Sequence, residues 1–270
     1  MSKAKGFTLI ELIVAMAVFS ILMLGVMQIA GPMSEAAATN AVVNNQKMVE
    51  NNIITYLGEN LRYATNVMII EGNGSLSPDD AIAEFIKANP VDAYGNSIFP
   101  KPGTPNDPAN DAAKLKVKLI CFDRASDYIY KNQKYSGRLI SSIEGRTTNT
   151  LNLSNIKQDG TSNMYEVFGN DYYDHADYYL TAQIKDNQLN LRVDSDYYYN
   201  NAHKKFNDSQ TNPVVGTFEL RGINRSTASR VCISIQTGTT AKEHVASAAR
   251  GPSVYNRVYF VYLYPEDYTD

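Results

Sequence analysis

The sequence predicts an α+β fold, in which one long N-terminal helix packs on the antiparallel β-sheet of a head. Residues 7–31 are almost entirely apolar, with Glu11 as their only charge. The next stretch carries apolar residues at spacings of four and seven, which is typical of an amphipathic helix. Beyond residue 115, short runs rich in Val, Ile, Leu and Tyr alternate with turn residues, as strands do. A helix that buries one stripe against such a sheet is a common α+β solution.

The apolar run is long enough to cross a membrane. A helix of 25 residues rises about 37 Å, and the hydrocarbon core of a bilayer is about 30 Å thick. Lys3 and Lys5 precede the run. By the positive-inside rule these lysines place the N-terminus in the cytoplasm, so the rest of the chain is exported.

An ordinary secretory signal is the alternative to a spanning helix. Its apolar region is about 7–15 residues long and ends in a small-residue cleavage site. The alanines at 36–38 offer such a site. However, the apolar run is longer than a signal requires, and Gly31-Pro32 intervenes.

Glu11 is the anomaly of this segment. Insertion scales put the cost of a charged group at the centre of a membrane helix at about 2.5–3.5 kcal/mol. Such a group is retained when another charge compensates it. The alternative is a lone glutamate that reaches toward the interface, since Glu11 lies near the start of the helix.

The residues around Glu11 resemble a known family. The run Lys5-Gly6-Phe7-Thr8-Leu9-Ile10-Glu11-Leu12 is similar to the leader and mature start of type IV pilins and of the pseudopilins of type II secretion and competence systems. The resemblance implies that a prepilin peptidase cleaves between Gly6 and Phe7 and methylates the new amine of Phe7. It also implies that Glu11 pairs with the Phe7 amine of a neighbouring subunit.

On this interpretation residues 1–6 are a leader, 7–31 the transmembrane and assembly helix, and 32–70 an amphipathic stem helix. Residues 71–270 are an α+β head of one or two lobes. Many major pilins carry a proline in the middle of the first helix, and this chain has none there. We therefore expect any bend at Gly31-Pro32.

Within the head, Ser77 as N-cap and Pro78 as first residue predict a short helix that ends before Pro90. Residues 95–108 read as a loop. Residues 179–193 predict a hairpin with its turn at Asp186-Asn187. Residues 243–250 fit a helical crossover or a loop. We expect strands at residues 116–122, 128–130, 165–168, 178–184, 188–193, 214–220, 230–236 and 257–264.

Composition and motifs argue against catalysis. The net charge is −3, which gives no overall basic footprint for nucleic acid. No nucleophile elbow, phosphate-binding glycine loop or metalloprotease helix is present. We therefore expect a protein that is not an enzyme and that needs no catalytic cofactor.

The two cysteines, Cys121 and Cys232, both lie in apolar stretches that read as strands. Export permits a disulfide between them. Two free buried thiols are the alternative, because the sequence does not show how far apart the strands lie.

Acidic residues flank both strands of the predicted hairpin at the end away from its turn. Oxygen ligands of this kind suit Ca²⁺. The alternative is two solvated acidic loop ends, since the spacing is not that of an EF-hand. The candidate calcium ligands are Asp171, Asp174, Asp177, Asp194 and Asp196.

Tyrosines accompany the same aspartates. If exposed, they form an adhesive face for a partner pilin, a glycan or a secreted protein. Packing in the core or on the sheet is the alternative. The tyrosines concerned are Tyr172, Tyr173, Tyr197, Tyr198 and Tyr199.

The sequence thus predicts a structural subunit, a minor pilin or pseudopilin, with an anchored precursor that becomes part of an extracellular or periplasmic filament. The order of stem, hairpin and the strand at 232–235 resembles the J/W class of minor pseudopilins. The partners implied are other subunits, prepilin peptidase, the inner-membrane assembly machinery and a surface ligand. The rivals are an adhesin-like pilin whose head binds a surface, glycan or DNA, and an unrelated single-pass membrane protein.

Overall fold

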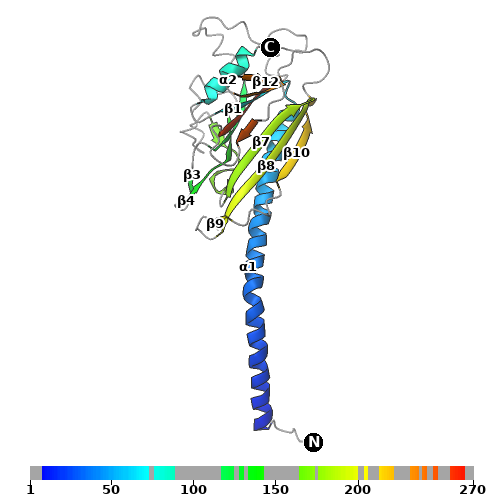
Figure 1. Cartoon of the computed structure of the whole chain (residues 1–270), viewed down its shortest axis with the longest axis vertical. Coiled ribbons are helices and arrows are strands. Elements are labelled where there is room, and N and C mark those ends of the chain that lie inside the picture. Colours follow the sequence, from blue (N-terminus) through cyan, green and yellow to red (C-terminus); the bar gives the residue numbers. More distant parts are fainter. Residues whose placement is uncertain are drawn as a thin grey trace, which may run out of the picture. The chain divides into compact units, whose positions relative to one another are not determined.

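The structure is a computed structural model, and the predicted α+β class is confirmed (Figure 1). Residues 1–47 form one compact unit and residues 48–270 another. The structure describes residues 8–72, 76–88, 117–124, 128–130, 133–142, 164–173, 176–199, 204–205, 213–221, 232–236, 239–241, 246–248 and 256–264.

Helix α1 (Leu9–Arg62) is continuous over 54 residues and contains Pro32. Proline lacks the N–H that would bond to the preceding turn, yet the residues on both sides of it remain helical. The predicted stem, residues 32–70, is too long, because α1 ends at Arg62 and β1 (Asn66–Gly72) follows. Every residue of β1 is buried. An apolar run of this kind cannot be told from a buried helix by periodicity alone.

Among the described residues the larger sheet has seven strands, in the order β12-β11-β1-β14-β2-β5-β6. Its strands besides β1 are β2 (Lys118–Asp123), β5 (Arg138–Ser142), β6 (Met164–Glu166), β11 (Cys232–Gln236), β12 (Thr239–Ala241) and β14 (Arg257–Leu263). All neighbours are antiparallel except β1 and β11, which run parallel. Strand β1 therefore lies between two strands from the last part of the chain.

The smaller sheet has the strand order β10-β8-β7-β13, and β9 also pairs with β8. Its long hairpin was predicted correctly: Asp186 and Asn187 form the turn with φ of 52° and 60°. Positive φ at both central residues is the requirement of a type I′ turn. The strands are β7 (Ala176–Lys185), β8 (Gln188–Tyr199), β9 (Lys204–Lys205), β10 (Val214–Glu219) and β13 (Ala246–Ala248), and a separate ribbon joins β3 (Tyr128–Tyr130) and β4 (Gln133–Tyr135).

Helix α2 (Pro78–Lys87) begins as predicted, with Ser77 as N-cap and a capping box that includes Asp80. Its apolar residues pack with those of β1, β2, β5 and β14 in one buried cluster. The hydroxyl of Tyr259 donates a 2.6 Å hydrogen bond to the carbonyl of Leu76, just before α2. This bond fixes the start of α2 against β14.

The last turns of α1 belong to the head and are packed tightly. Ile53, Leu57 and Leu61 are fully buried. At Gly58 an added Cβ would overlap the ring of Phe218 in β10, so only glycine leaves room for that ring. This close approach explains why a glycine stands inside the helix, although glycine lowers helix stability by roughly 1 kcal/mol relative to alanine.

Some predictions for the head were wrong. The crossover or loop expected at 243–250 contains β13, and strands β1, β4, β5, β9 and β12 were not predicted. The expected strand at 165–168 ends at Glu166, because the chain turns at Val167-Phe168. Of the predicted loop at 95–108 nothing is described.

Candidate functional site

The start of α1 surrounds Glu11 with hydrogen bonds from its own chain. Thr8 precedes the first helical residue, and its backbone N–H and its hydroxyl each donate to Glu11 Oε2 at 2.9 Å. In return the Glu11 N–H donates to Thr8 Oγ1 at 3.4 Å. This is the reciprocal pattern of a capping box, which satisfies N–H groups that lack a helical partner. Gly6 and Phe7 lie outside the described residues.

The prediction from sequence omitted Thr8, although Ser/Thr-x-x-Glu before an apolar run is a signature of helix N-termini. The box gives Glu11 polar partners before any second subunit is present. The helix dipole also favours a negative charge in the first turn. Glu11 nevertheless remains exposed on the helix surface and available to another chain.

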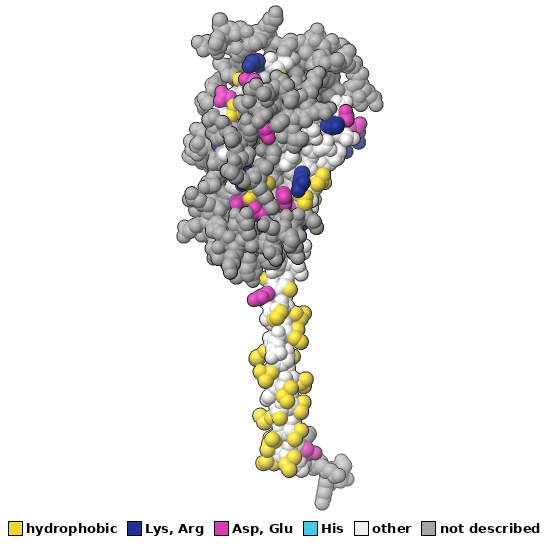
Figure 2. All heavy atoms as spheres, in the orientation of Figure 1, with side chains coloured by type: hydrophobic (Ala, Val, Ile, Leu, Met, Phe, Trp, Pro, Cys, Tyr) yellow, Lys and Arg dark blue, Asp and Glu magenta, His cyan; other side chains and the backbone are white. Residues whose placement is uncertain are grey.

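The rest of this helical segment is an uncovered apolar surface. Every residue from Thr8 to Ala38 is exposed, and Figure 2 shows yellow apolar side chains along the visible face of this part of α1. A stretch of α1 is long and apolar enough to cross a membrane. In water such a surface would be costly, so lipid or other helices must cover it.

Comparison with known proteins identifies this segment. Residues 1–27 carry the prokaryotic N-terminal methylation motif. That motif is the signal of type IV pilin and pseudopilin precursors, which prepilin peptidase processes. Together with the apolar helix it fits a membrane-anchored precursor, and it points to a structural subunit that assembles with others of its kind. No curated protein and no solved structure matches the chain.

The head of this precursor carries the predicted calcium ligands, and the three with described side chains have protein partners. Asp177 accepts hydrogen bonds from the N–H and hydroxyl of Ser136 at 2.8 and 3.0 Å. Asp196 accepts one from Tyr179 at 2.8 Å, and Asp194 lies 3.9 Å from Arg192. The side chains of Asp171 and Asp174 lie outside the described residues.

The two acidic clusters do lie at one end of the hairpin, since Asp177 is opposite Asp196 in the β7–β8 register. Among the described residues, however, no three His, Cys, Asp or Glu side chains come together as metal ligands. Bound Ca²⁺ stays an untested prediction.

The sequence left open whether Cys121 and Cys232 form a disulfide or remain free thiols. Cys121 on β2 is a free, buried thiol. Strands β14 and β1 separate β2 from β11, which begins at Cys232. At about 4.8 Å per strand the two backbones lie roughly 14 Å apart, and a disulfide needs Cα atoms within about 7 Å. The alternative of a free thiol holds for Cys121.

The reactivity of Cys121 provides a test of this placement. Burial, followed by the nearby charge of Asp123, raises the pKa of its thiol well above the ordinary value. In a Cys232→Ser variant at pH 8 we expect alkylation on the order of 100-fold slower in the folded than in the unfolded chain, because the reactive thiolate is scarce and enclosed. Mass spectrometry of the labelled chain measures both rates, and equal rates would contradict the buried position.

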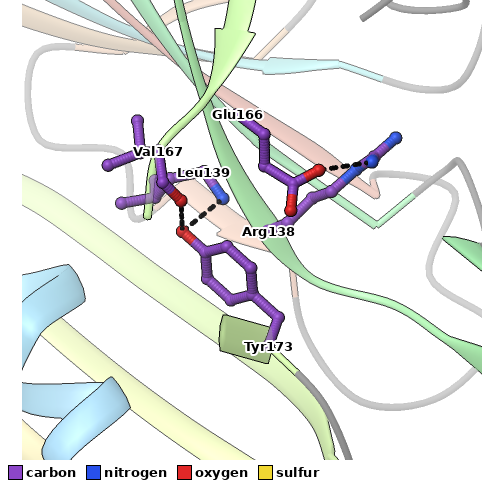
Figure 3. Close-up of polar contacts among 5 residues, drawn as sticks. All are labelled: Arg138, Leu139, Glu166, Val167 and Tyr173. Atoms are coloured by element: carbon purple, nitrogen blue, oxygen red, sulfur yellow. Dashed lines mark hydrogen bonds and ion pairs between the residues drawn. The ribbon is translucent and has the colours of Figure 1, made fainter. Parts of the chain in front are cut away.

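The tyrosines expected on a common exposed face differ in environment. Tyr173 is fully buried, so for this residue the alternative of packing in the core holds. Its hydroxyl donates to the carbonyl of Val167 at 2.8 Å and accepts from the N–H of Leu139 at 3.3 Å (Figure 3). Tyr172 is half-buried and accepts a hydrogen bond from Asn52. The side chains of residues 197–199 lie outside the described part of the chain.

A buried ion pair holds the edge strand β6 to β5. Arg138 Nη1 lies 2.8 Å from Glu166 Oε2 (Figure 3). The other oxygen of Glu166 is buried without a hydrogen-bond partner among the described residues. Burial raises the pKa of this carboxyl, and Arg138 offsets only part of the effect. Together with Tyr173, this pair fixes the segment that follows β6.

The raised pKa predicts how stability depends on pH. A carboxyl whose pKa is higher in the folded state gives stability that is present below its unfolded pKa and is lost as pH rises through the folded pKa. Relative to Glu166→Gln, the native chain should therefore gain free energy of unfolding as pH falls from 7 toward 4.5. Urea unfolding of both proteins at three pH values measures the free energy of unfolding of each. If the native chain loses stability relative to Glu166→Gln as pH falls, the buried position of the carboxyl is contradicted.

Proposed function

We propose that this chain is a minor type IV pilin or pseudopilin. It is inserted as a precursor, cleaved by prepilin peptidase between Gly6 and Phe7, methylated on the Phe7 amine and assembled into or at the tip of a filament. The observation that carries the proposal is the methylation motif at residues 1–27, continued by an exposed apolar helix that begins with the Thr8–Glu11 box. The resemblance to the J/W class and the large head support a minor subunit.

In the proposed assembly step Glu11 exchanges partners. In the free subunit its carboxylate accepts from Thr8 alone among the described residues, with two hydrogen bonds but no opposite charge. In a filament the Phe7 amine of the neighbouring subunit supplies that charge, which compensates the glutamate away from water. The exposed apolar residues of α1 pack against the same helix of other subunits. The inner-membrane machinery drives the transfer.

The decisive experiment is processing by prepilin peptidase. The chain and the enzyme are co-expressed, and the mass of the purified product is measured. We expect loss of residues 1–6 and gain of one methyl group, whereas a Gly6→Val variant stays at precursor mass. An unprocessed native chain, beside a known prepilin that the same enzyme cleaves, would refute the proposal and its adhesin-like variant alike.

An adhesin-like pilin is the second candidate. It is favoured by aromatic side chains that remain exposed on the head, Phe168 at 44% and Tyr165 at 37%. Deletion of the gene separates the two roles. Loss of filaments indicates an assembly subunit, and filaments that form but no longer adhere indicate an adhesin.

A further inference from the structure

One surface of the head collects aromatic rings from separate parts of the chain. We call it the aromatic patch and define it by its five members. They are Asn52 and Tyr56 of α1, Tyr165 of β6, and Phe168 and Tyr172 of the segment after β6. We propose that the aromatic patch binds an uncharged sugar. The proposal specifies a ligand for the adhesin-like role, and its test does not require filament assembly.

The five side chains contact one another in a continuous array. The ring of Phe168 lies 5.7 Å from that of Tyr56 in an edge arrangement and 4.7 Å from that of Tyr172. The hydroxyls of Tyr56 and Tyr165 are 3.3 Å apart. The amide of Asn52 donates to the hydroxyl of Tyr172. The patch thus places ring surfaces beside hydroxyl and amide groups.

Phe168 occupies a backbone conformation that suits its residue type poorly. Its φ is 72°, and that of the following Gly169 is 84°. Asn-Gly is the pair that usually takes two consecutive positive φ values, because side chains other than those of Asn and Asp are strained there. A phenylalanine in this position is held at the tip of a turn with its ring partly in water. Strain of this kind is concentrated at functional sites.

The chemistry of the patch matches a sugar ring. One face of a pyranose presents C–H groups, which pack on aromatic rings, and its rim presents hydroxyls, which need donors and acceptors. Phe168, Tyr165 and Tyr56 supply rings, and the phenols and Asn52 supply polar groups. Burial raises the pKa of Tyr56, so its hydroxyl stays protonated. The patch contains no Asp, Glu, Lys, Arg or His, which favours a neutral ligand over an anionic one.

The exposed ring area of the patch is small. An aromatic side chain offers about 200 Å², so Phe168 and Tyr165 expose roughly 90 and 75 Å² at their exposed fractions of 44% and 37%. A stable protein interface takes about 800 Å² from each partner. The exposed rings therefore suit one or two sugar units.

The turn that carries Phe168 is held by contacts on both sides. The Arg138–Glu166 pair and the two hydrogen bonds of the Tyr173 hydroxyl fix both sides of the turn that carries Phe168. A site that is already ordered loses less conformational entropy on binding.

The test uses the whole chain, purified in a detergent without a sugar head group. It is applied to an array of neutral glycans, and the strongest glycan is then titrated while tyrosine fluorescence is followed, since the chain has no tryptophan. We expect saturable binding with a millimolar Kd, typical of small weakly held ligands. Phe168→Asn should weaken binding about tenfold or more, because it removes the ring and leaves a residue that accepts positive φ.

Two further variants complete the design. Tyr165→Phe keeps the ring, removes one hydroxyl and should weaken binding by less than Phe168→Asn. Tyr63→Ala removes an exposed tyrosine that is not part of the patch and should bind as the native chain does. Circular dichroism and thermal unfolding verify that each variant is folded. Because binding is measured on unassembled protein, a failed prepilin cleavage would not affect it.

Three results would overturn the proposal. The first is an array on which the native chain gives no more signal than Phe168→Asn. The second is glycan binding that the folded Phe168→Asn variant retains. The third is concentration-dependent dimerisation that Phe168→Asn abolishes, which would make the patch an interface between copies of the chain.

Discussion

Replacement of Glu11 by leucine is expected to leave the precursor cleaved and the head folded, but to remove the subunit from filaments. In the proposed assembly the carboxylate gains a charged partner only when a neighbour supplies its Phe7 amine, and this pairing favours transfer of the native chain from the lipid into the filament. A charge in the membrane costs about 2.5–3.5 kcal/mol. Loss of that driving force should reduce incorporation on the order of 100-fold, at 1.4 kcal/mol per factor of ten.

Sheared filaments and membrane fractions, compared by immunoblot, measure this incorporation. Glu35→Leu is the matched control, because Glu35 is also an exposed acid on α1 but lies beyond the apolar run. It should assemble normally. Thr8→Val should still assemble, since the capping box of Thr8 and Glu11 provides hydrogen bonds only within one chain and no contact with a neighbour. Normal incorporation of Glu11→Leu would contradict the proposed pairing.

Replacement of Gly58 by alanine is expected to destabilise the head, although alanine favours helices by roughly 1 kcal/mol over glycine. The added methyl group meets the Phe218 ring of β10, and Gly216 in the same strand already packs closely on Ile54. Overpacking of an enclosed contact costs about 1–3 kcal/mol, and this figure is an upper bound here because Phe218 is only partly buried. We therefore expect a net loss of up to about 2 kcal/mol in the free energy of unfolding, measured with urea.

Two further variants test whether the contact with the Phe218 ring causes this loss of stability. Gly31→Ala adds the same methyl group to α1 where no atom lies within 4 Å, so it should not destabilise the chain. Phe218→Leu should recover part of the loss when combined with Gly58→Ala, because neighbouring substitutions are not additive. Equal effects of Gly58→Ala and Gly31→Ala would refute the close packing of β10 on α1.

The predictions that succeeded from sequence depend on local patterns. The apolar run, the Ser77 cap and the Asp186-Asn187 turn each have a short signature that tertiary contacts do not override. The predictions that failed depend on contacts between distant segments. Strand β1 was taken for helix because it becomes a strand by pairing with β11 and β14, and the sequence does not display that pairing.

The same distinction holds for the sites. Glu11 was identified because one charge in an apolar run is conspicuous without a structure. The bonding of Cys121 and Cys232 stayed open from sequence because strand order alone determines their separation. Phe168 was missed because a phenylalanine at φ 72° runs against residue preference, and its neighbour Tyr56 is more than a hundred residues away.

The position of β1 has a consequence for when the head can fold. Its neighbours β11 and β14 begin at Cys232 and Arg257, so the first strand after α1 cannot pair with them until almost the whole chain has been synthesised. The register joins Asn66 to Leu263. Contacts of such long range make folding slow and leave apolar strands open meanwhile. In the proposed export, the head therefore folds only after translocation is nearly complete, and its apolar strands need protection from aggregation until then.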